Sequence, residues 1–115
     1  IDAVIDAKSA TVDLMDNISL LAPFGEANPE PIFVLKEMLV TRTNILKNGH
    51  IACTLTSKSG KYINAIAFRS VDTDLGFKLL NKEKLYLHVA GTLKKDSWRG
   101  NTKVQMQILD IAVAE

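Results

Sequence analysis

The stretch DTDLGFKLLNKEKLYLHVA, Asp72–Ala90, decides the fold of this chain, because the hydrophobic period changes within it. Asp72 or Thr73 can cap a short helix whose apolar residues continue to Leu80. From Leu85 onward, apolar residues alternate with other residues, which is typical of a β-strand. The sequence therefore predicts one short helix followed by a strand, in the middle of a chain that is otherwise rich in strand patterns.

Five strands are predicted around this helix, in the order strand, strand, strand, helix, strand, strand. Their ranges, read from alternation and β-branched content, are Phe33–Ile45, Ile51–Thr56, Tyr62–Arg69, Leu85–Ala90 and Lys103–Ile108. This order favours the OB-fold, a five-stranded Greek-key barrel, over an SH3-like barrel. The reason is that a helix between the third and fourth strands plugs the open end of an OB barrel. The expected fold class is mainly β (α+β).

Local details of the barrel are also predicted. Residues 36–37, Lys-Glu, interrupt the alternation of the first strand and indicate a β-bulge. The Asn-Gly pair at residues 48–49 is favoured in tight hairpin turns, so a turn is expected there. Ile66 and Phe68 are expected to point into the core. Residues 94–101 are expected to form a polar connection.

Residues 1–30 differ from the rest of the chain in charge and pattern. They carry six acids and one base, a net charge of −5, whereas residues 31–115 carry thirteen bases and seven acids, a net charge of +6. Apolar residues recur at helical spacing from Val12 to Leu21, and all three prolines follow. We therefore predict an N-terminal amphipathic helix and proline-rich connector over residues 1–30. Residues 31–115 are predicted to be the OB-fold domain, which is better suited to an anionic partner.

The composition is that of one globular domain. The chain has 115 residues, of which 47% are hydrophobic and 23% charged, and no apolar run has the length of a transmembrane helix. It shows no secretory signal and does not begin with Met, so we expect a fragment of a longer protein. Cys53 is the single cysteine and is expected to be a small core residue. A reducing, cytoplasmic location without membrane association is expected.

The segment LAPFGEANPEPIF, Leu21–Phe33, resembles the sequence leading into the OB domain of the RecJ family, the single-stranded-DNA-specific 5′→3′ exonucleases of bacteria. Further similarity follows in register: AIAF at Ala65–Phe68, a hairpin containing Trp98 and Gly100, and QMQILDI at Gln105–Ile111. The resemblance covers nearly the whole chain. It implies the OB-fold domain of an enzyme that acts in DNA repair and recombination.

The resemblance also implies that phosphodiester cleavage belongs to a separate core with an Asp-His-His motif and a divalent metal, Mn or Mg. That motif is absent from this sequence, in which His50 and His88 lie far apart without carboxylates at a metal-ligand spacing. We therefore predict no catalytic residue, metal site or cofactor within this chain. Residues 1–22 would connect the domain to the missing core, and the parent protein would be the exonuclease.

Basic residues gather at predicted turns, which frame the strand-binding face of an OB barrel. Seven of the thirteen bases in residues 31–115 fall in three turns, where Asp96 is the only acid. Such cations gain affinity for phosphates by counterion release, and an exposed aromatic ring can stack on an unpaired base. The candidate nucleic-acid-binding residues are Lys47, Lys58, Lys61, Tyr62, Arg69, Lys94, Lys95, Trp98, Arg99 and Lys103.

These features also have structural interpretations. Turn lysines can serve only to block edge-to-edge pairing of strands, and Trp98 can cover the barrel instead of stacking on a base. His50 is expected to be a solvated turn residue. Two functions therefore stay open. One is a module that binds single-stranded DNA for a RecJ-like exonuclease, and the other is a protein-interaction module that docks partners such as single-strand-binding protein without touching DNA.

Overall fold

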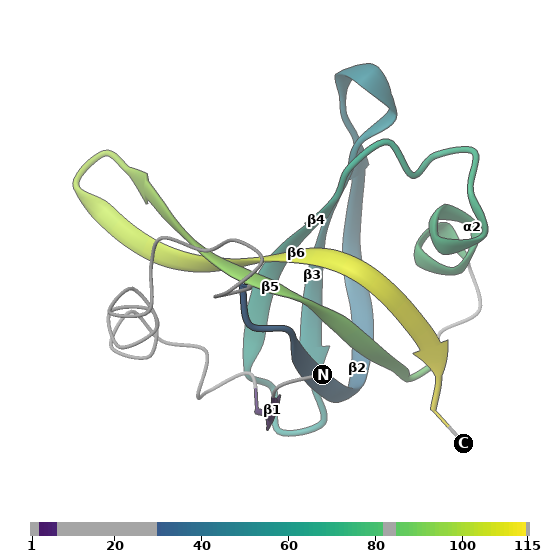
Figure 1. Cartoon of the computed structure of the whole chain (residues 1–115), viewed down its shortest axis with the longest axis horizontal. Helices are drawn as coiled ribbons and strands as arrows, with labels where there is room; N and C mark the ends of the chain where they lie inside the picture. The colour runs from purple at the N-terminus through teal and green to yellow at the C-terminus, as the bar shows by residue number, and fades with distance from the viewer. Residues whose placement is uncertain (1–2, 7–29, 82–84, 115) are drawn as a thin grey trace.

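The computed structural model describes residues 3–6, 30–81 and 85–114, and among these it describes only the backbone of Ala3, Asp96 and Trp98. Figure 1 shows the path of the chain. The predicted N-terminal helix and two of the three prolines lie outside the described residues. The predicted division at residue 30 is therefore not tested by the fold.

Five strands close into a barrel, as the sequence predicts. They are β2 (Phe33–Ile45), β3 (Ile51–Ser57), β4 (Tyr62–Ala67), β5 (Leu87–Trp98) and β6 (Asn101–Val113). Their order around the barrel is β2-β3-β4-β6-β5, and a β2–β5 pairing closes the ring. The β4–β6 pairing is parallel, and the other pairings within the barrel are antiparallel. A sixth strand, β1 (Ala3–Ile5), lies parallel to the start of β2.

The predicted helix is present between the third and fourth barrel strands. This helix, α2 (Asp74–Leu80), begins after Thr73, whose side-chain oxygen accepts a hydrogen bond from the N–H of Gly76 at 3.1 Å. Leu79 is only 1% exposed and joins the barrel core, so the helix covers the barrel at the side shown in Figure 1. The N-cap and the apolar anchor are both local features, which explains why the sequence revealed them.

The barrel core consists of the inward-facing residues of all five strands. On β4 these are Ile63, Ala65 and Ala67, so the prediction that Ile66 and Phe68 point inward is wrong. Phe68 is 48% exposed. The pairing with β3 explains the difference, because directly paired residues share a face and the buried β3 residues pair with this set.

The predicted β-bulge in β2 is confirmed. The β2–β5 register shifts between Leu35 and Met38, and Glu37 has a positive φ of 54°. The bulge bends β2, so that its first residues pair with β1 and β5 and its later residues pair with β3. One long strand therefore takes part in both halves of the barrel.

Residues 94–101 form a β-hairpin, which confirms the hairpin implied by the family resemblance and corrects the polar connection predicted from the sequence pattern. Strands β5 and β6 stay paired as far as Trp98 and Asn101. Arg99 and Gly100, the two residues between them, have φ values of 51° and 79°. Positive φ at both positions is the requirement of a type I′ turn, which fits the right-handed twist of the flanking strands. The polar residues of this stretch therefore continue the ladder.

Candidate nucleic-acid interface

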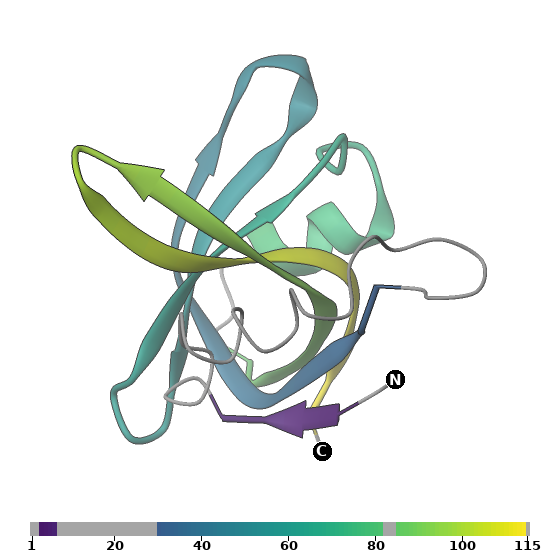
Figure 2. The same cartoon turned by 60° about the vertical axis from the view of Figure 1, so that its left-hand side comes forward.

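The candidate residues lie at two ends of the barrel. Lys47 lies in the β2–β3 turn, a short 3-10 element η2 (Lys47–Gly49), and Arg99 lies at the tip of the β5–β6 hairpin. Both hairpins extend into the upper half of Figure 1 and Figure 2, whereas the β3–β4 turn, which carries Lys58 and Lys61, lies at the bottom. The seven residues of β3 separate the two ends by about 20 Å. The three basic turns therefore do not form one cluster.

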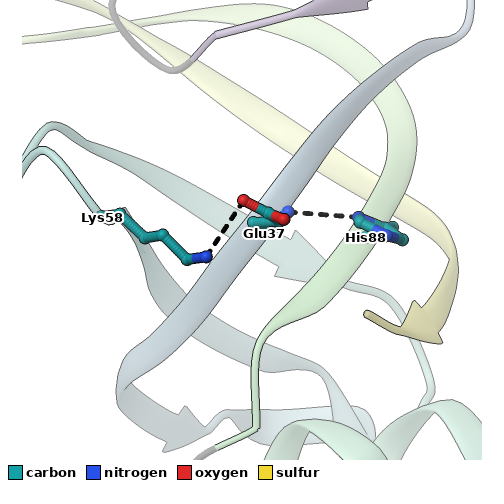
Figure 3. A network of polar contacts seen from close by, with 3 residues as sticks. All are labelled: Glu37, Lys58 and His88. Atoms are coloured by element: carbon teal, nitrogen blue, oxygen red, sulfur yellow. Dashed lines mark hydrogen bonds and ion pairs between the residues drawn. The ribbon is translucent and has the colours of Figure 1, made fainter. Parts of the chain in front are cut away.

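Lys58 is engaged within the protein. Its Nζ lies 3.2 Å from Oε2 of Glu37 and 4.8 Å from the centroid of the Tyr86 ring. Figure 3 shows how the ion pair links the β3–β4 turn to the bulge of β2. Both charged side chains are at least half exposed, so the ion pair is worth at most about 1 kcal/mol. The contact nevertheless directs the Lys58 ammonium group towards an acid and a ring of the protein itself.

Three other candidate lysines lie on strands near the β5–β6 tip. Lys94 pairs with Gln105 across the ladder, and Lys103 lies two residues from Gln105, so these two lysines share a face. Lys95 pairs with the buried Val104 and points to the opposite side. Lys94 forms an ion pair with Glu30. The hairpin therefore divides its cations between two faces.

Tyr62 and Arg69 lie at opposite ends of β4. Tyr62 is 59% exposed on the outer face, close to the β3–β4 turn. Arg69 is exposed just beyond the other end of β4, and its main-chain N–H donates to Nδ1 of His50 at 2.9 Å. The predicted stacking role of Trp98 concerns a side chain outside the described part of the structure, although its backbone ends β5.

A polar row crosses the outer face of the barrel. Direct cross-strand pairing connects five residues on five neighbouring strands, in the order Arg42, Thr54, Asn64, Gln105 and Lys94. All five are exposed or half-buried, and neighbouring strands are about 4.8 Å apart, so the row is about 19 Å long as measured along the curved surface of the barrel. It has a cation at each end and hydrogen-bonding side chains between them. Such a row can contact several phosphates and base edges of one strand.

Tyr62 borders a shallow depression beside this row. The depression has a volume of about 400 Å³ and is lined by Arg42, Thr54, Thr56, Gly60, Tyr62 and Asn64. The Thr54 hydroxyl donates to Oδ1 of Asn64 at 3.4 Å, which leaves the amide nitrogen of that residue directed elsewhere. An aromatic ring, a guanidinium group and an amide around one depression can together accept a nucleobase and its phosphate.

Arg42 is the residue that sequence reasoning missed. It lies within the predicted first strand, where a second register irregularity between Val40 and Arg42 determines which way its side chain faces. The polar run Thr41–Asn44 near the end of the predicted strand was the available signal. That run alone does not specify a neighbour, because the partners on β3 and β4 come from the fold.

The described residues contain no group of three or more His, Cys, Asp or Glu side chains that could hold a metal ion. None of the helices described is both long and apolar enough to cross a membrane. Cys53 lies in the core, as predicted, and burial raises the pKa of its thiol to about 12. His50 differs from its prediction, because it is half-buried and its ring meets the Phe68 ring edge-on with centroids 4.9 Å apart.

These features define the class of the protein. A closed barrel of five strands with a helix between the third and fourth is an OB-fold, as predicted. A family model described as the RecJ OB domain matches residues 1–110. The chain belongs to this family of RecJ OB domains.

Relatives of known identity agree with this assignment. The chain is 28% identical over 98 residues to the single-stranded-DNA-specific exonuclease RecJ of Thermus thermophilus, and 26% identical over 119 residues to that of Bacillus subtilis. These alignments span 85% and 100% of this chain but only 13% and 14% of the two relatives. The crystal structure of Thermus thermophilus RecJ with Mn²⁺ matches the whole of this chain with a TM-score of 0.70 and 26% identity. The matched region is 16% of that structure's chain.

The OB-fold of this chain also resembles that of a protein with little sequence similarity to it. A mitochondrial single-stranded DNA-binding protein of Saccharomyces cerevisiae, Rim1, matches 73% of this chain and 92% of its own length with a TM-score of 0.56. The identity is 10%, so this likeness concerns the fold alone.

Proposed function

We propose that this chain is the single-stranded nucleic-acid-binding module of a RecJ-like exonuclease. The observation that carries the proposal is the polar row from Arg42 to Lys94, which has a cation at each end and the exposed Tyr62 ring beside it. Phosphates would be held at Arg42 and, in exchange for its surface ion pair with Glu30, at Lys94. An unpaired base would stack on the tyrosine ring. Membership of the RecJ OB domain family supports this function.

The other candidate cations extend this interface. Lys47, Arg69, Arg99 and Lys103 would contact phosphates from the hairpins that flank the outer face, and Trp98 would supply a second ring at the β5–β6 tip. A smaller contribution to phosphate binding is expected from Lys58, Lys61 and Lys95. Lys58 is engaged with both Glu37 and the Tyr86 ring, and Lys61 borders a different depression together with Lys36 and Ser57. Lys95 points to the opposite side of the hairpin. The interface is therefore centred on the face of β3 and β4.

The parent protein would carry out the chemistry. We propose that it is a single-stranded-DNA-specific exonuclease of DNA repair and recombination in the cytoplasm, with a divalent metal, Mn or Mg, in a catalytic core outside this chain. The described residues do not fit a metal site, so no catalytic step is assigned to them. The module would provide grip on the substrate and selectivity for single strands.

Titration of labelled oligonucleotides tests the proposal. We expect fluorescence anisotropy to show binding to single strands that weakens steeply as salt rises, and weaker binding to a duplex of the same length. The slope of log Kd against log salt counts the phosphates engaged, at about 0.7 per contact for single strands. Equal affinity for duplex and single strand, or affinity independent of salt, would exclude this function.

A protein-docking function is the second candidate. A groove of about 240 Å³ lies between α2, β2 and the end of β6, and its lining includes Leu80, Leu85 and Val113. Leu85 and Val113 are 42% and 44% exposed. The lining also includes Arg42, Lys78 and Asn81, so the groove is partly polar and suits a peptide segment with both apolar and polar side chains, such as one from single-strand-binding protein. A pull-down with that protein, compared with binding to naked oligonucleotide, separates the two functions.

A further inference from the structure

Phe68 lies on the same outer face as Tyr62. It follows β4 by one residue and continues its alternation, in which Ile63, Ala65 and Ala67 are buried. Phe68 is 48% exposed, and Tyr62 is 59% exposed. The two positions are six residues apart, or about 20 Å along an extended strand. One face of the barrel therefore presents an aromatic ring at each end of the same strand.

The Phe68 ring is held in place without being buried. The His50 ring meets it edge-on, with centroids 4.9 Å apart and an interplanar angle of 89°. His50 is fixed in turn, because its Nδ1 accepts the Arg69 N–H at 2.9 Å. The Ser70 hydroxyl donates to the Phe68 carbonyl at 3.0 Å. A ring fixed in this way loses little conformational entropy when a ligand stacks on it.

Cations flank this ring. Arg69 is the next residue along the chain, and Lys47 lies in the turn that leads to His50. The β2–β3 turn and the end of β4 are joined, because Ser70 N–H donates to the Gly49 carbonyl at 2.9 Å. Within the described residues, neither Lys47 nor Arg69 forms a salt bridge, unlike Lys58 and Lys94. An aromatic ring beside two available cations matches a nucleotide, with a base for the ring and phosphates for the cations.

We propose that Phe68 is a second nucleobase-stacking position on the face of β4, in addition to Tyr62, with Lys47 and Arg69 holding the adjacent phosphates. The proposal rests on the single-stranded nucleic-acid function proposed above and extends it to the β2–β3 end of the face. One strand would stack on Tyr62 at one end and on Phe68 at the other, while the polar row lies between them. The length of such a path agrees with the site size of one OB barrel, which is about 4–16 nucleotides.

Oligonucleotide binding by variants of the whole chain tests this role. Phe68→Ala and Phe68→Leu should each weaken binding by about five- to a hundredfold, because the leucine keeps apolar area but provides no ring. Phe68→Trp should keep or improve the affinity. The salt slope should stay unchanged in all three, whereas Lys47→Ala and Arg69→Ala should each lower it by about 0.7. Phe77→Ala is the matched control, because this phenylalanine is 69% exposed but lies on α2 and not on the face of β4. It should leave oligonucleotide binding unchanged.

The outcomes distinguish failure of the Phe68 proposal from failure of the single-stranded nucleic-acid-binding function on which it rests. If Tyr62→Ala weakens binding and Phe68→Ala does not, the second stacking position is refuted while the proposed function stands. If the wild-type chain binds no single strand, the proposed function is wrong, and the Phe68 proposal is wrong with it. If Phe68→Ala leaves oligonucleotide binding intact but abolishes association with the rest of the parent enzyme, Phe68 is a docking residue and the proposal is wrong. Equal losses in Phe68→Ala and Phe77→Ala would also overturn it.

Discussion

The main-chain N–H of Glu37 donates a hydrogen bond to Nδ1 of His88 at 3.1 Å, across 51 positions of sequence. Figure 3 shows that the carboxylate of the same glutamate meets Lys58 on the other side. Glu37 has a φ of 54°, a conformation that costs a non-glycine residue about 1 kcal/mol or more. The two contacts stabilise the bulge at which β2 leaves β5 and begins to pair with β3.

Replacing His88 should therefore weaken the barrel at this bulge. His88→Leu removes the acceptor for the Glu37 N–H, and we expect the free energy of unfolding to fall by about 0.5–1.5 kcal/mol in chemical denaturation. His88→Asn supplies a side-chain oxygen and should lose less. If the leucine variant were as stable as the wild type, water would be satisfying the Glu37 N–H equally well.

Substitution of Gly76 should destabilise the fold, although it lies in a helix. Alanine normally stabilises a helix relative to glycine by up to about 1 kcal/mol. Here a Cβ would stand 1.8 Å from the Ser70 carbonyl oxygen, a backbone atom. We expect Gly76→Ala to cost about 2–4 kcal/mol, measured by thermal or urea unfolding.

Gly60→Ala is the matched control for this prediction, because nothing lies within 4 Å of its added Cβ and only its φ of 87° opposes alanine. Its cost should be about 1–2 kcal/mol. A stabilising Gly76→Ala substitution would show that the approach of α2 to Ser70 is looser than described.

Cys53 should make the stability fall at alkaline pH. Burial raises the pKa of the thiol from 9.0 to about 12 in the folded protein. The unfolded chain therefore loses the thiol proton first, and the free energy of unfolding should fall between about pH 9 and pH 12, by at most about 1.4 kcal/mol per pH unit. Below pH 9 this contribution is fully present.

The comparison with Cys53→Ala isolates this effect from tyrosine and lysine titration. The difference in unfolding free energy between wild type and variant should be constant below pH 9 and shrink above it. The native thiol should also react slowly with a thiol reagent at pH 8 and rapidly after denaturation. Fast labelling of the folded protein would contradict its burial.

Arg42 and Tyr62 should affect nucleic-acid binding in different ways. Arg42→Ala should lower the salt slope of oligonucleotide binding by about 0.7, because one phosphate contact is lost. Tyr62→Ala should weaken binding by about 1–3 kcal/mol with the slope unchanged. Lys58→Ala should change both little, because its ammonium group already contacts Glu37. If Lys58→Ala lowered the affinity or the salt slope more than Arg42→Ala, the interface would lie at the β3–β4 turn and not along the polar row.

Most of the fold could be predicted because its signals are local. The predicted first strand has the observed bounds, Phe33–Ile45, and the bulge inside it interrupts a plain alternation. Thr73 caps the helix through an oxygen three residues from the N–H that it accepts. The family resemblance was carried by a contiguous proline-rich segment. Each of these features is contained in a few consecutive residues.

The candidate site was less predictable because its residues meet only across strands. The lysines are visible in the sequence, but their separation to two ends of the barrel depends on the length of β3. Arg42 gains its neighbours Thr54 and Asn64 from pairing with β3 and β4. The inward face of β4 was assigned incorrectly for the same reason, and Phe68 was placed in the core.

The sequence by itself determined the number of barrel strands, the position of the helix and the family, since alternation, capping and turn chemistry act over short distances. Only the tertiary structure decided which side of each strand meets the core. In a strand whose two faces are both partly apolar, such as β4, the register with its neighbours decides that side. That choice put Phe68 beside His50 on the surface and placed Arg42 and Lys94 at the two ends of one row.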